Sequence, residues 1–571
     1  MATPVRTVWL GPDSLVTALG DKAATLEAIE GRRTGLAFDP RRQLIVGALP
    51  PECLPIGLPD GYTRLEALAI RAVEPTLAAA GLRLDDDRVQ LLLSTTKGNV
   101  DRLAGCGDTV PDEAFLGHTA RQIARYFQAA RPPIVISNAC ISGLSALIVG
   151  QRLLHAGECD HAIVVGIDLL SEFITEGFRS FQSLSDRPCR PYDADRDGLT
   201  LGEACGALLL TTDRQRALEP AVALPGGAVT NDANHISGPS RTGDGLYHAI
   251  RLALEQADTE PRQVGTVNTH GTATLYNDEM ESKALRWARL DHTPANSLKG
   301  YFGHTLGASG IVESILCAEE LRRRIVYGTQ GFSTLGVPCA IEVSPDHRPL
   351  EHPCCVKTAS GFGGCNAAIV LAAEADGAAR PVVTARPEPS IRTSAAYRLP
   401  RGDRDFGAFI RDEFRALDAP NLKFYKMSDL AKALYVAAER LLSQTRPLGE
   451  RYAPTEIALV LSNRSSSLDT DLRHQRTLDR HEPPSPAHFV YTLPNVAAGE
   501  ICIRHRIQGD NTFFIEEHGS DQSESYARLL LRNGHARAAI CGRCELLGDT
   551  WEVDLKLLET ADEPRHTDTH A

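Results

Sequence analysis

The chain has 571 residues, more than one hydrophobic core ordinarily holds, so its length predicts two or more domains. Apolar residues make up 43% and charged residues 23%, which is typical of a globular protein and excludes disorder over the whole chain. The formal charge of −13 argues against a nucleic-acid-binding protein, because an acidic chain repels phosphate backbones.

Membrane, secretion and metal-binding patterns are not found. No apolar run reaches the length needed to cross a bilayer, and the N-terminus lacks the apolar core and cleavage site of a signal peptide. The 14 cysteines are scattered without paired C-x-x-C units, which predicts neither a zinc site nor a disulfide framework. We therefore expect a cytoplasmic protein whose cysteines are mostly buried thiols.

The pattern of the chain changes near residue 375. Residues 1–375 alternate short β-rich apolar runs, such as VQLLLST (89–95), with helical spacing, as in LSALIVGQRLLHAG (144–157). This alternation predicts an α/β fold with largely buried strands. Residues 376–394 gather Pro, Ala, Arg and Ser without periodicity and are interpreted as a linker. A second domain over 395–560 and a frayed tail over 561–571 follow.

The second domain resembles a repeat of the N-terminal half of the first. Three segments recur in the same order: 61–82 in 424–442, 89–99 in 457–467, and 134–166 in 513–542. With one common offset, Gly157 falls on Gly534 and Cys140 falls on Glu517. Three parallels in the same order favour a degenerate duplication.

Cys140 lies between a small polar run and a long apolar helical run in NACISGLSALIVGQRLL (138–154). A cysteine at this point meets the free N–H groups and partial positive charge of a helix N-terminus. These lower the pKa of a thiol, and the thiolate is the nucleophile. On position alone, a buried packing cysteine is the commoner alternative.

Three later segments favour the nucleophile. VNTHGTATLYND (267–278) places His270 before a Gly-Thr turn, SLKGYFGHTLGASG (297–310) places Lys299 five residues before His304, and KTASGFGGCNAAIVL (357–371) is a glycine-rich turn before an apolar strand. Alone, each histidine or glycine run is more often structural. Together, one cysteine and two histidines on separate strand ends suit acyl transfer through a thioester.

Residues 1–373 resemble the β-ketoacyl-acyl carrier protein synthases, condensing enzymes of the thiolase superfamily. The motifs that carry the resemblance occur in the order CRPYDADRDGLTLGEACGALLL (189–210), NDANHISGP (231–239), HGTATLYND (270–278), KGYFGHTLGASGIVE (299–313) and GFGGCNAAIVL (361–371). The resemblance implies a thiolase-like αβαβα layered fold, with a C-terminal α/β domain like the N-terminal half of the same fold.

The resemblance also implies residue roles. Cys140 matches the nucleophile, His270 and His304 match the pair that promotes decarboxylation and stabilises the enolate, and Lys299 matches a lysine that supports them. Asp278 and Glu313 match a surrounding acidic network, Phe362 matches the gating phenylalanine, and the backbone N–H groups of Cys140 and Phe362 would form the oxyanion hole. An ordinary buried ion cluster remains the alternative for Lys299, Asp278 and Glu313.

Some positions depart from the family pattern. Cys365 stands where threonine is usual, Ser360 stands where a phenylalanine often precedes the gate, and LLLSTTKGN (91–99) replaces a glycine-rich stretch. The last resembles the aryl polyene and related polyketide branch. Degradative thiolases use a second cysteine as acid and base, but we interpret Cys365 as a packing residue.

The second domain is predicted to be non-catalytic. Glu517 occupies the nucleophile position, a carboxylate cannot form the thioester, and no histidine motif follows. The domain is expected to pack on the synthase, shape its dimer surface or dock a partner, with a structural appendage as the alternative. A half module should expose an apolar face unless something covers it.

The sequence therefore predicts an acyltransferase that joins a Cys-bound acyl chain to malonyl-acyl carrier protein by decarboxylative Claisen condensation, in a polyene or polyketide-type pathway. The alternatives are an elongating synthase of primary fatty acid synthesis, a chain-length-controlling structural subunit, or a non-decarboxylating acyltransferase. We expect acyl carrier proteins as partners and a homodimer, or a heterodimer with a chain-length-factor-like subunit. No metal or free cofactor is expected, since phosphopantetheine arrives on the carrier.

Overall fold

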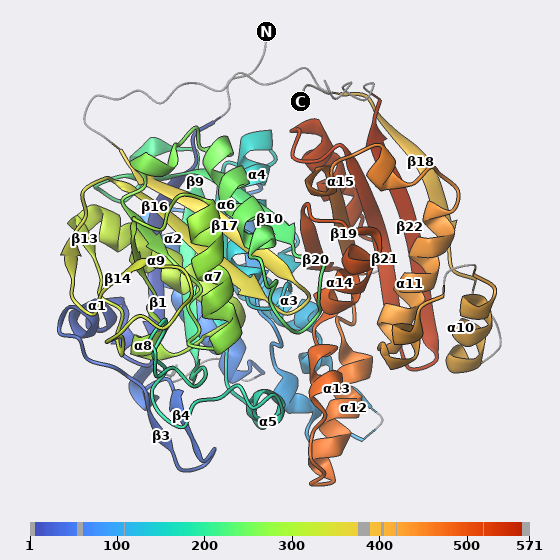
Figure 1. Ribbon diagram of the computed structural model, residues 1–571, viewed down its shortest axis with the longest axis horizontal. Coiled ribbons are helices and arrows are strands. Elements are labelled where there is room, and N and C mark those ends of the chain that lie inside the picture. The colour runs from blue at the N-terminus through green and yellow to red at the C-terminus, as the bar shows by residue number, and fades with distance from the viewer. Residues whose placement is uncertain are drawn as a thin grey trace.

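The computed structural model describes residues 6–53, 61–107, 109–374, 389–400, 405–417, 420–517 and 519–561 (Figure 1). We call residues 6–374 the first region and residues 389–561 the second region. Figure 1 shows the second region, in orange and red, lying beside the first.

Five strands form the N-terminal sheet of the first region. They pair in the order β1 (Trp9–Thr17), β9 (Ala204–Thr211), β7 (His161–Asp168), β5 (Val89–Ser94) and β6 (Ile134–Ile136). The pairings of β7 with β5 and of β5 with β6 are parallel, and β5, β7 and β9 are apolar and buried on both faces. Continuous apolar runs of this kind are typical of strands covered by helices on both sides.

The C-terminal sheet of the first region lies behind a central helical layer. Its strands are β10 (Val222–Asn231), β17 (Cys365–Ala373), β16 (Cys354–Gly361), β11 (Thr266–Asn268), β12 (Pro294–Asn296) and β14 (Glu342–Val343). Helices α4 (Ser142–Ala156) and α9 (Ser309–Arg323) contact strands of both sheets, while α2 (Arg64–Ala80) covers the first sheet and α6 (Asp244–Gln256) the second, with α7 (Leu275–Trp287) against α6. These five layers confirm the predicted αβαβα fold.

Local sequence fixes where the outer helix α2 begins and ends. The Thr63 side chain accepts a hydrogen bond from the Glu66 N–H, and the Glu66 carboxylate accepts one from the Thr63 N–H. This reciprocal cap satisfies N–H groups that have no partner within the helix. The helix ends at Gly81, whose φ of 62° lies in the left-handed region that glycine tolerates.

The second region repeats the N-terminal sheet in mirror order. Its strands are β20 (Asn511–Ile515), β19 (Ile457–Asn463), β21 (Ala538–Leu547), β22 (Thr550–Thr560) and β18 (Ile391–Arg398). Pairing is parallel twice and then antiparallel twice, as in β6, β5, β7, β9 and β1. Helices α11 (Asp429–Leu442) and α15 (Gln522–Arg532) match α2 and α4, and both Gly157 and Gly534 have positive φ. The predicted repeat is confirmed.

The two regions share one continuous sheet. Strand β20 pairs antiparallel with β6, with Phe514 opposite Ile136 and Ile515 opposite Val135. The edge of β6 in the first region is thus covered by a strand of the same chain. Further helices of the second region, α12 (Leu468–Asp479), α13 (Pro486–Val490) and α14 (Pro494–His505), connect β19 to β20.

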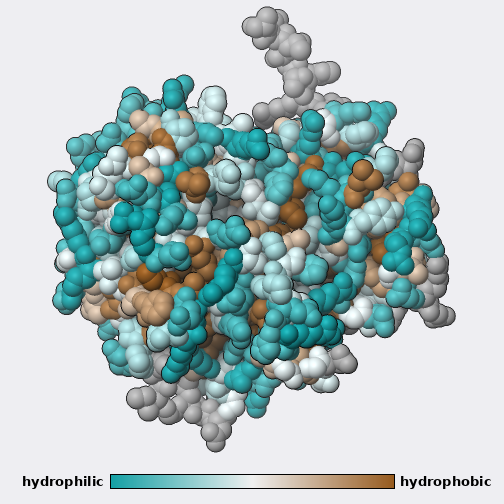
Figure 2. All heavy atoms as spheres, turned by 60° about the horizontal axis from the view of Figure 1, so that its bottom comes forward, coloured by the Kyte–Doolittle hydropathy of each residue, from teal (hydrophilic) through white to brown (hydrophobic). Residues whose placement is uncertain are grey.

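Helix α15 of the second region presents a polar outer side, not the apolar face that we expect of an uncovered half module. Helix α15 buries one side, including Tyr526 and Leu530, while its outer side carries residues such as Ser525, Arg528 and Arg532. Figure 2 shows hydrophilic side chains over most of the surface in view, with the largest apolar area on the side of the first region. No C-terminal sheet covers α15 among the described residues, and the helix is amphipathic accordingly.

Smaller elements complete the first region. The remaining strands are β2 (Gly20–Asp21), β3 (Ala37–Asp39), β4 (Leu44–Gly47), β8 (Leu201–Gly202), β13 (Ile325–Val326) and β15 (Arg348–Pro349). The remaining helices are α1 (Lys22–Glu30), α3 (Leu116–Tyr126), α5 (Glu172–Ser180), α8 (Lys299–Phe302) and, in the second region, α10 (Phe406–Arg415).

The structure differs from the sequence predictions at the linker and at one apolar stretch. Strand β18 begins at Ile391, inside the range 376–394 predicted as a linker, because its residues pair with β22; residues 375–388 and the predicted tail from 562 on lie outside the described residues. The stretch Ala139–Ala156 is apolar and long enough to cross a membrane, contrary to the sequence reading, but 89% of it is buried inside the protein as a core helix.

Candidate functional site

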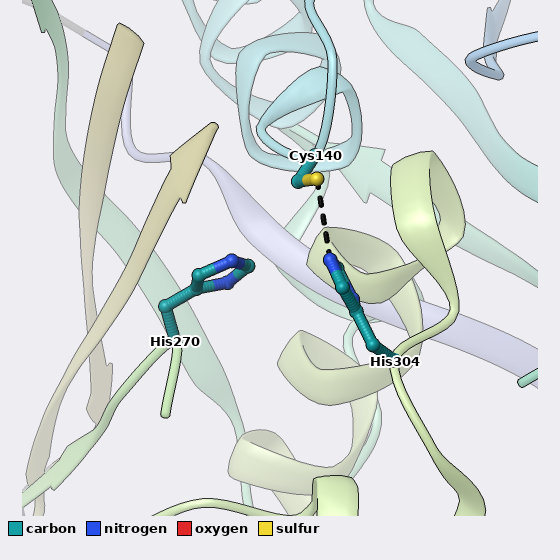
Figure 3. Close-up of side chains that lie close together, drawn as sticks. All are labelled: Cys140, His270 and His304. Carbon is teal, nitrogen blue, oxygen red and sulfur yellow. Dashed lines mark hydrogen bonds between the residues drawn. The ribbon is translucent and has the colours of Figure 1, made fainter. Parts of the chain in front are cut away.

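Cys140 stands at the junction of β6 and α4. Ala139, just before it, has φ 47°, a left-handed conformation that is uncommon outside glycine and clusters at functional sites. The turn aims the Cys140 side chain from the N-terminal end of α4 (Figure 3). Burial raises the pKa of the thiol to about 12, while Lys299 acts to lower it. The expected lowering by the helix N-terminus is thus outweighed, and the resting thiol is neutral.

Two histidines face Cys140 from different loops. His304 follows α8, and its Nε2 lies 3.2 Å from Cys140 Sγ. His270 follows β11, and its ring lies edge-on to that of His304, with 5.0 Å between centroids and 86° between planes (Figure 3). Burial, and then the Lys299 charge, hold the pKa of both imidazoles well below the usual value. Both rings are therefore neutral at neutral pH and able to donate or accept a proton.

A buried ion cluster lies behind the histidines. Glu313 of α9 accepts from Lys299 Nζ at 2.7 Å through one oxygen and lies 2.5 Å from Lys357 Nζ through the other. All three side chains are at most 1% exposed. Lys299 and Glu313 were predicted from the sequence; Lys357 was not. The lone lysine in the apolar strand CCVKTASG was the one visible indication.

Asp278 lies in a separate cluster. Its oxygens accept hydrogen bonds from the backbone N–H groups of Thr272 and Tyr192, at 3.1 and 2.8 Å. Burial, with the nearby Glu281, raises the pKa of Asp278 to about 7. Glu281, three residues on along α7, accepts from the N–H of His270 at 2.8 Å and was missed by the sequence analysis. Asp278 and Glu281 thus brace the turn that carries His270.

The Phe362 turn lies against Cys140 and against the second region. A side chain at Gly361 would come within 3.1 Å of the Cys140 nitrogen, so the turn and the nucleophile are neighbours. The Phe362 ring stacks on Phe181 at 5.3 Å. The Phe362 carbonyl accepts from Asn495 Nδ2 of α14 at 2.8 Å, and the buried Cys365 thiol lies 3.3 Å from the same oxygen.

The arrangement of the cluster can support acyl transfer. One atom each of Cys140, His270 and His304 lie within 4.8 Å of one another, a spacing also found at metal sites. The ammonium groups of Lys299 and Lys357 disfavour a cation beside them. A thiol in contact with one imidazole, with a second imidazole opposite, can instead be deprotonated and acylated.

Two family models match the chain, both within the first region. "Beta-ketoacyl synthase, N-terminal domain" matches residues 64–216, and "Beta-ketoacyl synthase, C-terminal domain" matches residues 222–333. A Streptomyces halstedii protein named as a polyketide beta-ketoacyl synthase is 30% identical over 325 residues, which is 54% of this chain and 76% of the relative.

Two solved structures show how the regions relate to known folds. A ketosynthase in complex with its chain length factor, from Xenorhabdus doucetiae, is 31% identical with a TM-score of 0.58, covering 65% of this chain and 98% of that one. The structure titled "PfaC Keto synthase-Chain length factor" is 13% identical with a TM-score of 0.78, covering 97% of this chain and 78% of that one. The latter likeness concerns the fold, and it extends over both regions.

Proposed function

The chain belongs to the β-ketoacyl synthase family and is a condensing acyltransferase, and from this premise we propose that it extends a Cys140-bound acyl chain with malonyl-acyl carrier protein by decarboxylative Claisen condensation. The observation that carries the proposal is the 3.2 Å contact between Cys140 Sγ and His304 Nε2, with the His270 ring opposite.

In the first stage, Cys140 accepts the acyl chain. The thiol proton passes to His304 Nε2, the sulfur attacks the carrier thioester, and the carrier leaves as its free thiol after taking the proton. Backbone N–H groups of Cys140 and Phe362 would donate to the carbonyl oxygen in the transition state. Phosphopantetheine is brought by the carrier, so the chain needs no resident cofactor for this step.

In the second stage, malonyl-acyl carrier protein loses carbon dioxide. The remaining enolate attacks the Cys140 thioester carbonyl, which gives a β-ketoacyl carrier thioester and releases the cysteine. Neutral His270 can direct an N–H at the enolate oxygen, as can His304 in the tautomer that carries its proton on Nε2, which spreads the negative charge without a strong base. The cysteine leaves as a thiolate and takes up a proton from solvent. Lys299 and Glu313 support the two rings from behind.

We further propose that the second region takes the place of a partner subunit such as a chain length factor. Strand β20 pairs with β6 just before the nucleophile, and Asn138 Nδ2 donates to the Asn511 carbonyl at 2.6 Å. The acyl carrier protein then remains as the partner that must dock. A polyketide or polyene-type pathway is favoured by the polyketide relative; primary fatty acid elongation is the alternative.

Intact-protein mass spectrometry tests the proposal. Purified protein is mixed with carrier proteins loaded with saturated or conjugated acyl chains, beside a Cys140→Ala variant. We expect a mass gain equal to the acyl group, absent in the variant, and product formation after malonyl-acyl carrier protein is added. An acyl adduct that persists in Cys140→Ala would contradict the assigned nucleophile. Efficient use of saturated long chains with rejection of conjugated ones would contradict the pathway.

A further inference from the structure

We propose that Lys357 is a second positioning cation of the condensing site, which with Lys299 holds both oxygens of Glu313 and leaves one ammonium charge unbalanced behind the two imidazoles. The inference rests on the proposed function and adds a residue to it. Lys357 touches no reacting atom, so its role is to set the orientation and charge of the groups that do.

The contacts of Lys357 lead directly to the site. Its Nζ lies 2.5 Å from Glu313 Oε2 and donates to the carbonyls of Thr358 at 2.8 Å and Thr269 at 3.3 Å. Thr269 is the residue before His270, so one ammonium group joins the acidic residue of α9 to the turn that carries an imidazole. With Lys299 on its other oxygen at 2.7 Å, Glu313 cannot rotate without breaking an ion pair.

Within the cluster of Lys299, Glu313 and Lys357 the charges do not cancel. One carboxylate, Glu313, contacts two ammonium groups at a fully buried position, where charges act strongly. Glu281 lies on the other side of the His270 turn, where it accepts from the N–H groups of His270 and Gly271 and from the Tyr192 hydroxyl. The charge of Glu281 also acts on Lys299. The other titratable groups that face the two lysines and the imidazoles are Cys140, Asp168, Cys189, Asp278, Cys317 and Glu320.

An unbalanced positive charge serves both stages of the reaction. The Lys357 charge opposes protonation of the imidazoles. It adds to two larger causes that lower the imidazole pKa, burial and the Lys299 charge, and so helps to keep both rings neutral as N–H donors. It also favours the enolate, which is negative, over the uncharged thioester. Removing the charge makes each imidazole easier to protonate, so the imidazole pKa rises and the acid limb of activity moves to higher pH.

The test compares Lys357→Met, Lys357→Gln and Lys357→Arg in the full-length protein. Condensation kcat/KM is measured against pH with acyl- and malonyl-acyl carrier protein, and the fold is checked by thermal melting. We expect the Met and Gln variants to lose about tenfold to a hundredfold in kcat/KM, as for other charged groups near a transition state. Both should show the acid limb at higher pH, whereas Arg, which keeps the charge, should retain the wild-type limb.

The Gln variant separates charge from hydrogen bonding, because it keeps N–H donors for the Thr269 and Thr358 carbonyls. The matched control is the double variant Lys97→Met/Asp471→Leu: Lys97 is also buried and ion-paired, with Asp471, and is not among the charges that act on either imidazole, and removing both partners leaves no unpaired buried charge. Its acid limb should stay at the wild-type pH. A wild-type limb in folded Lys357→Gln would overturn the inference.

Failure of the proposed function can be told apart from failure of this inference. The pH dependence of Cys140 alkylation by iodoacetamide reports the same imidazole contact without any carrier substrate. If the wild type forms no condensation product, a shift of that alkylation profile in Lys357→Gln still supports the role of Lys357, and an unchanged profile overturns it.

Discussion

Strands β9 and β22 hold equivalent places in the two halves of the mirror-ordered sheet, yet their sequences differ in kind. ACGALLLT in β9 is buried throughout, because helices cover both faces. TWEVDLKLLET in β22 alternates, with Trp551, Val553 and Leu555 buried and Glu552 and Asp554 between them less so. Strands with the same place in the topology can thus have different hydrophobic patterns. The pattern depends on whether one or both faces of the sheet are covered, not on how the strands are connected.

Helices α4 and α15 hold equivalent places in the two regions and differ in burial in the same way. Every residue of α4 from Ser142 to Leu154 is buried between two sheets, whereas α15 buries one side only. Among the described residues no second sheet covers the outer side of α15, and the residues on that side are polar. Glu524 of α15 pairs with Arg528 and Lys556 on that side.

The largest contrast is between Cys140 and Glu517. Placing a cysteine at position 517 should not create a second acylation site, because no pair of histidines faces it among the residues that the structure describes; Glu517 is half-exposed and pairs with Arg121 and Arg464. We expect Cys140→Ala/Glu517→Cys to remain unacylated and to lose condensation activity altogether. Mass spectrometry after incubation with acyl carrier protein measures this, and Glu517→Cys alone is the control. A second adduct in that control would show that position 517 still supports acyl transfer.

The next largest effect concerns the buried ion pair between the regions. Lys97 of the first region donates to Asp471 of α12 and, at 2.6 Å, to the Thr492 carbonyl. Asp471→Ala leaves an unpaired buried ammonium, which should lower the free energy of unfolding by about 3–5 kcal/mol. Urea denaturation measures the loss. The double variant Lys97→Met/Asp471→Leu should recover most of it; a double variant as unstable as the single would show that the charge is not the cause.

Core substitutions sharpen the comparison of helices. Ile148→Ala in α4 should cost about 2–5 kcal/mol, because it removes methyl groups from a close-packed site. Leu530→Ala on the buried side of α15 should cost a similar amount. Arg532→Ala on its outer side should change stability by less than about 0.5 kcal/mol. Urea midpoints of the three variants decide this, and a large loss for Arg532→Ala would mean that something covers the outer side.

The smallest expected effect is at the turn that carries Phe362. Asn495→Ala removes the donor to the Phe362 carbonyl, which should cost about 1 kcal/mol in stability. The rate of Cys140 acylation should change by a small factor, about twofold to tenfold, because the turn loses one of its restraints. Stopped-flow acylation with Asn495→Ala measures this, and Asn495→Asp, which keeps the size but not the donor, should behave alike. An unchanged rate of Cys140 acylation in both Asn495 variants would show that the contact with the second region does not affect the Phe362 turn.

The sequence was sufficient for the fold, because strand and helix patterns are local, and its motifs singled out one cysteine and two histidines that the structure brings together. Strand–helix alternation predicted the layers, and glycine-flanked motifs identified Cys140, His270 and His304. Lys357 and Glu281 were missed because a buried ion contact joins residues distant in sequence, and a single lysine or glutamate carries no local pattern. The thiol pKa was predicted in the wrong direction for a related reason: burial depends on every layer around Cys140.

The polar outer side of the second region could be predicted from the sequence. Polar residues recur along α15 and alternate along β22, a pattern typical of elements with one side in solvent. The pairing of β20 with β6 could not be predicted, because the sequence of a strand does not specify which strand, several hundred residues away, it pairs with.

Because β6 and β20 belong to one polypeptide, they pair within a single molecule, and the pairing equilibrium does not depend on protein concentration. The fraction of molecules with a complete sheet does not fall when the protein is diluted, whereas a site shared between two chains disassembles below their dissociation constant. The proposed function also predicts a stoichiometry: with Cys140 as the acylated residue, the acyl load should saturate at one per chain, half of what a pair of identical synthase subunits would hold.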